Sequence, residues 1–167
     1  MLKGLNIRIK KGLLFLVFMV CFIAAANAKD VVRKYIAKYK PLVDSLSIEY
    51  GIPVSIITAI SIVESGAGKS QPATLLNNHF GMVGRNTAMK RKGIKTKYKE
   101  YLNAAASFRD FCGMVSRKKY YRSLNGSNDY DKWVNAMAKA GYSTTPEVWK
   151  KEILYAIKKY KLDMVAE

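Results

Sequence analysis

Apolar residues recur at helical spacing along most of the chain after residue 30. In residues 31–50 they follow the three- and four-residue intervals of one helix face, and Pro41 within this stretch should kink or split the helix. Residues 54–65 are apolar nearly all round, which is typical of a buried central helix. Gly66 and Gly68 follow this stretch and predict the end of that helix.

Three more helices are predicted in the second half of the chain, at residues 104–115, 129–140 and 146–160. Gly141 suits the end of the second helix, and Pro146 suits the first turn of the third. The same apolar spacing therefore continues almost to the end of the chain.

The middle of the chain has a weaker pattern. Residues 71–85 indicate mostly loop, with a short helix near residues 73–76. Residues 86–99 are polar and basic, which favours a loop or a weak hairpin. No repeat or linker divides the sequence after residue 30. The pattern as a whole predicts a mainly α fold class, namely a single helical domain with an extended loop or small hairpin.

The first 28 residues differ in composition from the rest. Residues 1–11 carry four basic residues and no acid, residues 12–25 form an uncharged apolar run, and residues 26–28 are Ala-Asn-Ala. This order predicts a secretory signal peptide cleaved after Ala28, and hence export to the periplasm or the cell exterior. The apolar run is shorter than the ~20 residues of a membrane span, although an uncleaved membrane anchor is the alternative. The predicted mature domain is residues 29–167.

The formal net charge of +17 falls only to +13 when the predicted signal peptide is removed. A charge of this size favours binding to a polyanion. Nucleic acid is the usual candidate, but an exported protein meets anionic cell-wall polymers and membrane surfaces first, so we expect no nucleic-acid partner. The basic residues are scattered along the sequence, and a simply solvated basic surface is the other interpretation.

Cysteine and histidine are scarce in the predicted mature domain, where Cys112 and His79 are the single examples. One cysteine cannot form an intramolecular disulfide, and the apolar surroundings of Cys112 favour a buried side chain over a nucleophile. One histidine excludes a multi-histidine metal site. The sequence predicts no metal and no cofactor, and we expect a monomer.

Glu64 is the first candidate for chemistry. It lies at the end of the apolar stretch, on the same helix face as Ile60. Desolvation disfavours the charged form of a carboxyl, so these surroundings should raise its pKa, as a general acid near neutral pH requires. The small residues of the turn at 65–70 would let a bulky polymer approach the carboxyl. A helix-end glutamate paired with Lys69 is the structural alternative.

A second candidate is the sequence Asn-Asn-His-Phe-Gly that follows this turn. Amides suit the N-acetyl and hydroxyl groups of sugars, and aromatic rings suit sugar faces. Asparagine pairs also often hydrogen-bond the backbone of their own loop, so both roles are open. The candidate substrate-binding residues are Asn77, Asn78, His79, Phe80 and Gly81.

These two segments, with residues 51–59 before them, resemble the glucosaminidase domain of glycoside hydrolase family 73. The resemblance spans about residues 39–162. Further similar elements are Tyr98-Lys99-Glu100-Tyr101, Ser107-Phe108-Arg109-Asp110-Phe111, Trp133, Ala140-Gly141-Tyr142-Ser143-Thr144 and Pro146. Five ordered motifs along nearly all of the predicted mature domain make the resemblance specific.

The resemblance implies a lysozyme-like fold with the extended loop or small hairpin beside the cleft. It implies hydrolysis of the β-1,4 bond after N-acetylglucosamine in peptidoglycan, whose glycan strands would be the main partner. Glu64 occupies the general-acid position, and Tyr142 that of a tyrosine that helps organise the sugar or the reactive centre. Asn78, Phe80 and Gly81 fall on the loop that lines the cleft.

The sequence departs from the family at two places. Residues 82–99 contain no acid where many members carry a second one, and the nearby Glu100 sits inside the next element. Thr145 stands where the family usually has Asp. Because ordinary glycosidases use two carboxyls, we hypothesise that the 2-acetamido group of the substrate acts as the nucleophile beside Glu64.

Two other functions stay open at this point. A non-catalytic cell-wall-binding protein of the same fold would explain the missing acid and Thr145. A muramidase or a lytic transglycosylase, the latter needing one acid, would cut after N-acetylmuramic acid. The Asn-Asn-His-Phe-Gly sequence favours a glucosaminidase, since transglycosylases usually carry a Gly-Leu-Met-Gln type loop there.

Overall fold

A computed structural model describes residues 30–164, so the predicted signal peptide lies outside the described residues. The described residues fall into two units, which divide between residues 34 and 35. Apart from residues 30–34, which belong to the first helix, the elements discussed below lie in the second unit. Within residues 30–164, no helix combines the length and the apolar character that crossing a membrane requires.

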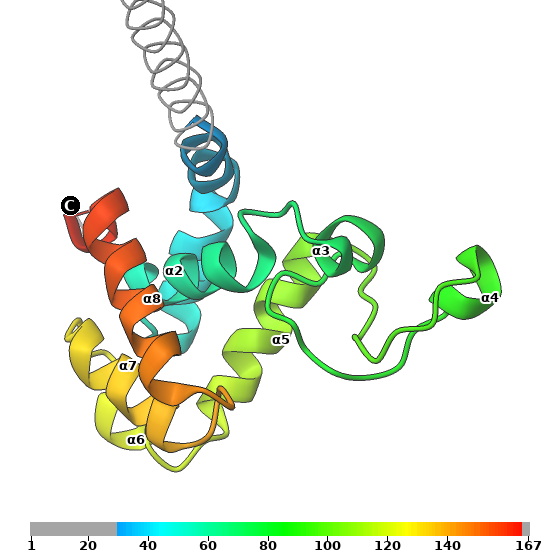
Figure 1. The fold of residues 1–167 in the computed structure, drawn as a ribbon. Helices are drawn as coiled ribbons and strands as arrows, with labels where there is room; N and C mark the ends of the chain where they lie inside the picture. The colour runs from blue at the N-terminus through cyan, green and yellow to red at the C-terminus, as the bar shows by residue number, and fades with distance from the viewer. Residues whose placement is uncertain (1–29, 165–167) are drawn as a thin grey trace, which may run out of the picture. The chain divides into compact units, whose positions relative to one another are not determined.

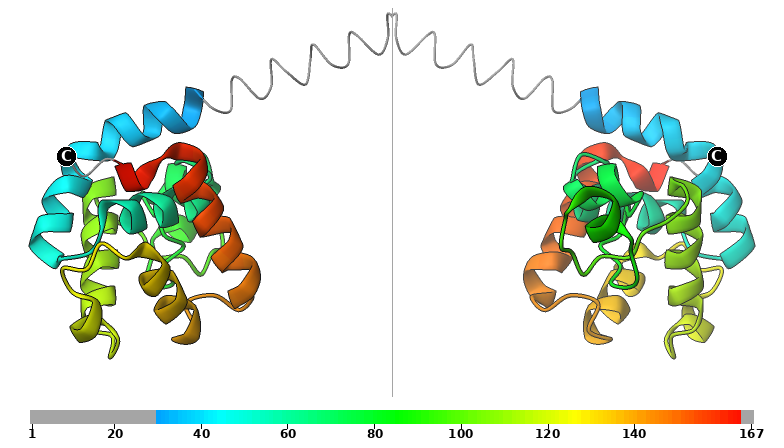
Figure 2. Two further views of the ribbon diagram at one scale, coloured as in Figure 1. Left: turned by 90° about the vertical axis from the view of Figure 1, so that its left-hand side faces the viewer. Right: turned by 90° about the vertical axis from the view of Figure 1, so that its right-hand side faces the viewer.

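The first helical stretch ends at Tyr50 and is continuous through Pro41. The predicted split is therefore wrong, but the predicted kink is present: the left view of Figure 2 shows the helix changing direction between its blue and cyan parts. Proline lacks the N–H for the preceding turn and its ring crowds the carbonyl four residues back, which bends a helix without ending it.

The central helix α2 (Val54–Ser65) has the predicted bounds and lies in the core. Pro53 precedes it, and the carbonyl of Pro53 accepts the N–H groups of Ile56 and Ile57 in the first turn. Gly66 ends it in a left-handed conformation with a φ of 56°. Since its isoleucines are almost fully buried, α2 is the element around which the others pack.

Two helices cover α2. They are α7 (Tyr130–Lys139) and α8 (Pro146–Tyr160), and both pack on α2 and on each other. Figure 1 shows α8 crossing in front of α2 with α7 beside it. The Asp129 side chain accepts the N–H of Lys132 and caps α7, which explains why this helix begins where the sequence predicted.

The helical body also contains three further α-helices and one 3₁₀ helix among the described residues. They are α3 (Gln71–Leu76), α5 (Ala104–Ser116), α6 (Tyr121–Leu124) and the 3₁₀ helix η1 (Leu162–Met164). The sequence predicted α3 and α5, but not α6 or η1. Cys112 lies buried within α5, as expected, and burial raises its thiol pKa to about 12.

Residues 83–100 form an excursion from the helical body, which we call the arm. Val83 and Tyr98 make an isolated antiparallel bridge at its base, and the N–H of Gly84 donates to the carbonyl of Lys97 at 3.0 Å. A short helix, α4 (Ala88–Lys92), which the sequence did not predict, stands at its far end, apart from the other helices in Figure 1. The arm is the small hairpin that the sequence predicted, although no strand longer than a bridge occurs within residues 30–164.

Candidate active site

Glu64 lies in the last turn of α2, where α8 crosses it. The indole Nε1–H of Trp149, from the first turn of α8, donates to Glu64 Oε1 at 2.9 Å. Trp149 is 4% exposed and Glu64 is half-buried, so this hydrogen bond is partly shielded from water. Within the described part of the chain, no ion pair joins Glu64 to Lys69, which removes the structural alternative considered above.

The surroundings of Glu64 raise its pKa. Burial is the largest cause, the hydrogen bond from Trp149 opposes it, and the negative charge of Glu152 adds to it. A raised pKa keeps a larger fraction of the carboxyl protonated near neutral pH. This is the protonation state that a general acid needs before it can donate.

Tyr142 lies in the loop between α7 and α8 and packs beside Glu64 and Trp149. Its ring centroid lies 5.0 Å from that of Trp149, and its ring and that of Phe111 meet edge to face at a centroid distance of 6.2 Å. The Tyr142 hydroxyl oxygen is buried and has no hydrogen-bond partner. Since buried polar groups are nearly always paired, this hydroxyl is a candidate for a hydrogen bond to a ligand.

The side chains of Glu64 and Tyr142 line the same cavity, which has a volume of about 480 Å³. Its wall also includes Phe80 and Gly81 from the predicted loop, and Lys97 from the arm. Among the described residues of this wall, Glu64 is the only acid. The cavity is large enough for part of a sugar chain, and it offers one carboxyl and one unpaired hydroxyl to whatever enters it.

Gly81 lies directly against the carboxyl. Its φ of +63° is in the left-handed region, and a Cβ at this position would lie 3.5 Å from Glu64 Oε2. Gly68, in the turn after α2, has a different role. A Cβ at this position would lie 2.9 Å from the Tyr35 ring. Gly68 therefore permits packing, whereas Gly81 leaves the Oε2 side of the carboxyl open.

The two asparagines of the predicted loop hold the loop together. Asn78 is 1% exposed, and its amide donates at 2.8 Å to the carbonyls of Met82 and Lys99. Asn77 ends α3 in a left-handed conformation and donates to the carbonyl of Tyr101 at 3.0 Å. These bonds fix the path of the loop toward Glu64 and join it to the end of the arm.

His79 is buried among aromatic rings. Its Nδ1 lies 2.9 Å from the Tyr35 hydroxyl, and burial, helped by the charge of Lys38, lowers its pKa to about 4. The ring is therefore neutral near pH 7. Of the five predicted substrate-binding residues, Phe80 and Gly81 line the cavity, whereas Asn77, Asn78 and His79 do not.

Two acids next to the predicted loop and the arm, Glu100 and Asp110, are engaged in contacts within the arm and α5. Glu100 accepts the N–H and the hydroxyl of Thr87, both at 2.8 Å, pairs with Arg91, and lines a separate cavity. Asp110 accepts Lys99 at 2.8 Å and the Tyr101 hydroxyl at 2.7 Å. In the described residues, no group of three His, Cys, Asp or Glu side chains could hold a metal ion.

Residues 40–162 match the sequence profile of the glucosaminidase family, described as mannosyl-glycoprotein endo-beta-N-acetylglucosaminidase. The chain is also 30% identical over 132 residues to exo-glucosaminidase LytG of Bacillus subtilis (strain 168). That match covers 69% of this chain and 46% of LytG, so the chain spans about half the length of this relative.

Solved structures share the fold. The catalytic domain of the autolysin Auto from Listeria monocytogenes gives a TM-score of 0.65 at 17% identity, covering 80% of this chain and 86% of that one. The glycoside hydrolase domain of FlgJ from Salmonella typhimurium gives a TM-score of 0.61 at 21% identity, covering 78% and 88%. The predicted mainly α, lysozyme-like fold is therefore confirmed.

Proposed function

The chain belongs to the glucosaminidase family of glycoside hydrolases, and on this premise we propose that it is an exported enzyme that cuts the β-1,4 bond after N-acetylglucosamine in peptidoglycan. The observation that carries the proposal is the position of Glu64. A carboxyl whose pKa is raised by burial lines a cavity together with an unpaired buried hydroxyl. Burial and the cavity together supply a protonated acid at a surface that a glycan can reach.

Glu64 acts as the general acid. It donates its proton to the glycosidic oxygen while the bond from that oxygen to the anomeric carbon breaks. The Tyr142 hydroxyl lies in the same cavity and donates a hydrogen bond to the reacting sugar, which satisfies a group that otherwise has no partner. Phe80 and Gly81 form the wall beside the carboxyl. Asn77, Asn78 and His79 support substrate binding by holding this wall in shape.

The substrate itself supplies the nucleophile. The carbonyl oxygen of its 2-acetamido group attacks the anomeric carbon and forms a cyclic oxazolinium ion. The Glu64 carboxylate then takes a proton from the water that opens this ring, and the acid is restored. The observation in favour is that no second carboxyl lines the cavity among the described residues. This route gives net retention at the anomeric carbon, and NMR during early turnover that finds net inversion would contradict it.

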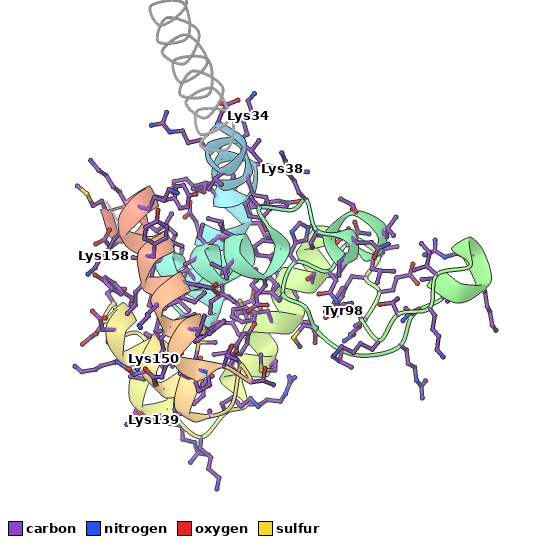
Figure 3. All side chains as sticks on the ribbon, viewed as in Figure 1. Lys34, Lys38, Tyr98, Lys139, Lys150 and Lys158 are labelled. Carbon is purple, nitrogen blue, oxygen red and sulfur yellow. The ribbon has the colours of Figure 1, made fainter. Side chains whose placement is uncertain are left out.

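Export and charge complete the proposal. Residues 1–28 act as a signal peptide cleaved near Ala28, and residues 29–167 form the catalytic domain, a monomer with a formal charge of +13. This charge holds the enzyme on anionic cell-wall or membrane surfaces, next to the glycan strands. Figure 3 labels Lys139, Lys150 and Lys158, which are distributed along α7 and α8 rather than gathered at one point.

The test is digestion of purified peptidoglycan by the wild type and by Glu64→Gln, which keeps the size of the side chain and removes the acid. Mass spectrometry of wild-type products should find N-acetylglucosamine at the reducing ends, and Glu64→Gln should release at least 100-fold less. Unchanged release by Glu64→Gln contradicts the role of Glu64.

Two outcomes would select the other functions. Wall binding by the wild type without any release of reducing sugars would favour a non-catalytic wall-binding protein. Products that end in anhydro-muramic acid, or in reducing N-acetylmuramic acid, would favour a lytic transglycosylase or a muramidase. The absence of an acid in residues 82–99, together with Thr145 near Tyr142, motivates the first of these alternatives.

A further inference from the structure

Trp149 is the side chain that touches both groups of the proposed active site. It donates a hydrogen bond to Glu64 at 2.9 Å, and its ring packs against that of Tyr142 at a centroid distance of 5.0 Å. We propose that Trp149 is a positioning residue that determines which oxygen of Glu64 carries the acid proton. This inference deepens the proposed function and rests on it for its catalytic consequence.

The first step of the argument is the chemistry of the indole. Its N–H group can donate a hydrogen bond but cannot accept one. Glu64 Oε1 must therefore act as the acceptor toward Trp149, and a proton on Oε1 would have to point away from a buried donor at 2.9 Å. The proton of neutral Glu64 consequently sits on Oε2.

The second step is the surroundings of Oε2. Gly81 approaches this oxygen, and its missing side chain leaves the space beside it unfilled. Gly81 and Glu64 both line the cavity of about 480 Å³. The proton on Oε2 therefore faces the open side of the site, where a glycosidic oxygen can approach it.

The third step is the rigidity of Trp149 itself. It lies in the first turn of α8, where its backbone N–H donates to the carbonyl of Thr145 at 3.0 Å, and its side chain is buried. One buried ring thus fixes the orientation of the Glu64 carboxyl and supports one face of Tyr142. Pre-organisation of this kind lowers the cost of reaching the reactive geometry.

The same hydrogen bond adjusts the acidity of Glu64. Burial raises the pKa of Glu64, and the donor at Oε1 acts in the opposite direction by stabilising the charged form. Other charged or titratable groups also face the site from the neighbouring elements. They are Glu152, Tyr142, Lys97, Lys118, Tyr120 and Tyr98. Loss of the Trp149 donor should therefore shift the Glu64 titration to higher pH while these groups stay in place.

The chain provides a matched control, because it has two tryptophans. Trp133 is fully buried, and its Nε1–H donates to the carbonyl of Ser127 at 2.9 Å, the same length as the bond from Trp149 to Glu64. Trp149→Phe and Trp133→Phe each remove one indole hydrogen bond made by a buried tryptophan, and each keeps an aromatic ring. Only the first of them removes a donor to the general acid.

The experiment titrates Glu64 in the free protein by NMR of side-chain carboxyl carbons, with Glu64→Gln identifying the signal. Trp149→Phe should shift this titration, and the alkaline limb of the activity profile, to higher pH. Its kcat should fall roughly ten-fold with little change in KM, because orientation rather than binding is lost. Trp133→Phe should leave both pH curves where they are in the wild type. Equal shifts in both variants, or none in Trp149→Phe, would overturn the proposal.

A measurement on the wild type covers the case in which Trp149→Phe does not fold. The indole N–H proton signal of Trp149 should move as Glu64 titrates, that of Trp133 should not, and the movement should vanish in Glu64→Gln. The proposal is overturned if the chemical shift of the Trp149 indole proton does not change as Glu64 titrates. These readings need no substrate, so they remain valid if peptidoglycan digestion fails and the proposed function is wrong.

Discussion

At the scale of single residues, the candidate site depends on the protonation of one carboxyl. A general acid is active only while protonated, so activity should fall as the pH rises through the pKa of Glu64. Burial raises that pKa and extends the active range to higher pH. Two residues shape this environment: Trp149 donates a hydrogen bond to Oε1, and Gly81, which has no side chain, leaves Oε2 open.

Gly81→Ala should lower activity more than stability. The new Cβ would lie 3.5 Å from Glu64 Oε2, on the side from which substrate approaches, so we expect kcat/KM on peptidoglycan to fall ten-fold or more. The positive φ of +63° adds a loss of about 1 kcal/mol in the free energy of unfolding. Rates of wall digestion and urea unfolding curves measure the two effects.

Gly126→Ala is the matched control for this substitution. Gly126 has a φ of +79° with nothing within 4 Å of its would-be Cβ, and it does not line the cavity. It should lose similar stability and keep its activity. If both variants lose activity to the same degree, the loss reflects general destabilisation and the role assigned to Gly81 is wrong.

The sequence indicated Glu64 as the candidate acid but did not indicate its hydrogen-bond partner, Trp149. Glu64 is recognisable because it is a single carboxyl at the end of an apolar helix, and this pattern is contained in a short stretch of sequence. Trp149 lies 85 positions away, and no local pattern connects it to Glu64 before α8 packs on α2. Asn78 was ambiguous for another reason: a buried amide that bonds backbone and an amide that binds a sugar have the same residue type.

At the scale of elements, the helices were predictable and the arm only in outline. The bounds of α2 and α8 agree with the sequence pattern, because both helices bury a continuous apolar face. The arm has no such face. Hydrogen bonds from polar side chains and an ion pair keep its two sides together. Such contacts have no sequence period, and α4 was missed for that reason.

Glu100 belongs to this polar framework, which gives a test of the single-acid mechanism. Glu100→Gln weakens its bonds to Thr87 and Arg91, so the arm should loosen and activity should fall less than ten-fold. Glu64→Gln, assayed beside it on the same peptidoglycan, should lose at least 100-fold. If Glu100→Gln were as inactive as Glu64→Gln, Glu100 would be the second catalytic acid and the substrate-assisted route would be wrong.

At the scale of the whole molecule, the charge is the property that the cavity does not explain. Residues 29–167 carry a formal charge of +13, and their lysines occur on the arm, on α7 and on α8 rather than around the cavity alone. A dispersed charge attracts an extended polyanion without demanding one orientation. We expect an enzyme held in this way to stay on the anionic wall while the contacts of its active site select the bond that is cut.

Binding to cell walls should therefore weaken steeply as salt is added. Screening shortens the reach of charge interactions from about 10 Å at 0.1 M salt to about 3 Å at 1 M, whereas contacts inside the cavity are screened much less. The measurement is sedimentation of Glu64→Gln with purified walls across this range, because the variant binds without degrading its target. Walls stripped of their anionic polymers are the control and should bind less protein at low salt, with a weaker salt dependence. Binding that stays constant to about 0.5 M salt would mean that sugar contacts, and not the charge of +13, hold the protein on the wall.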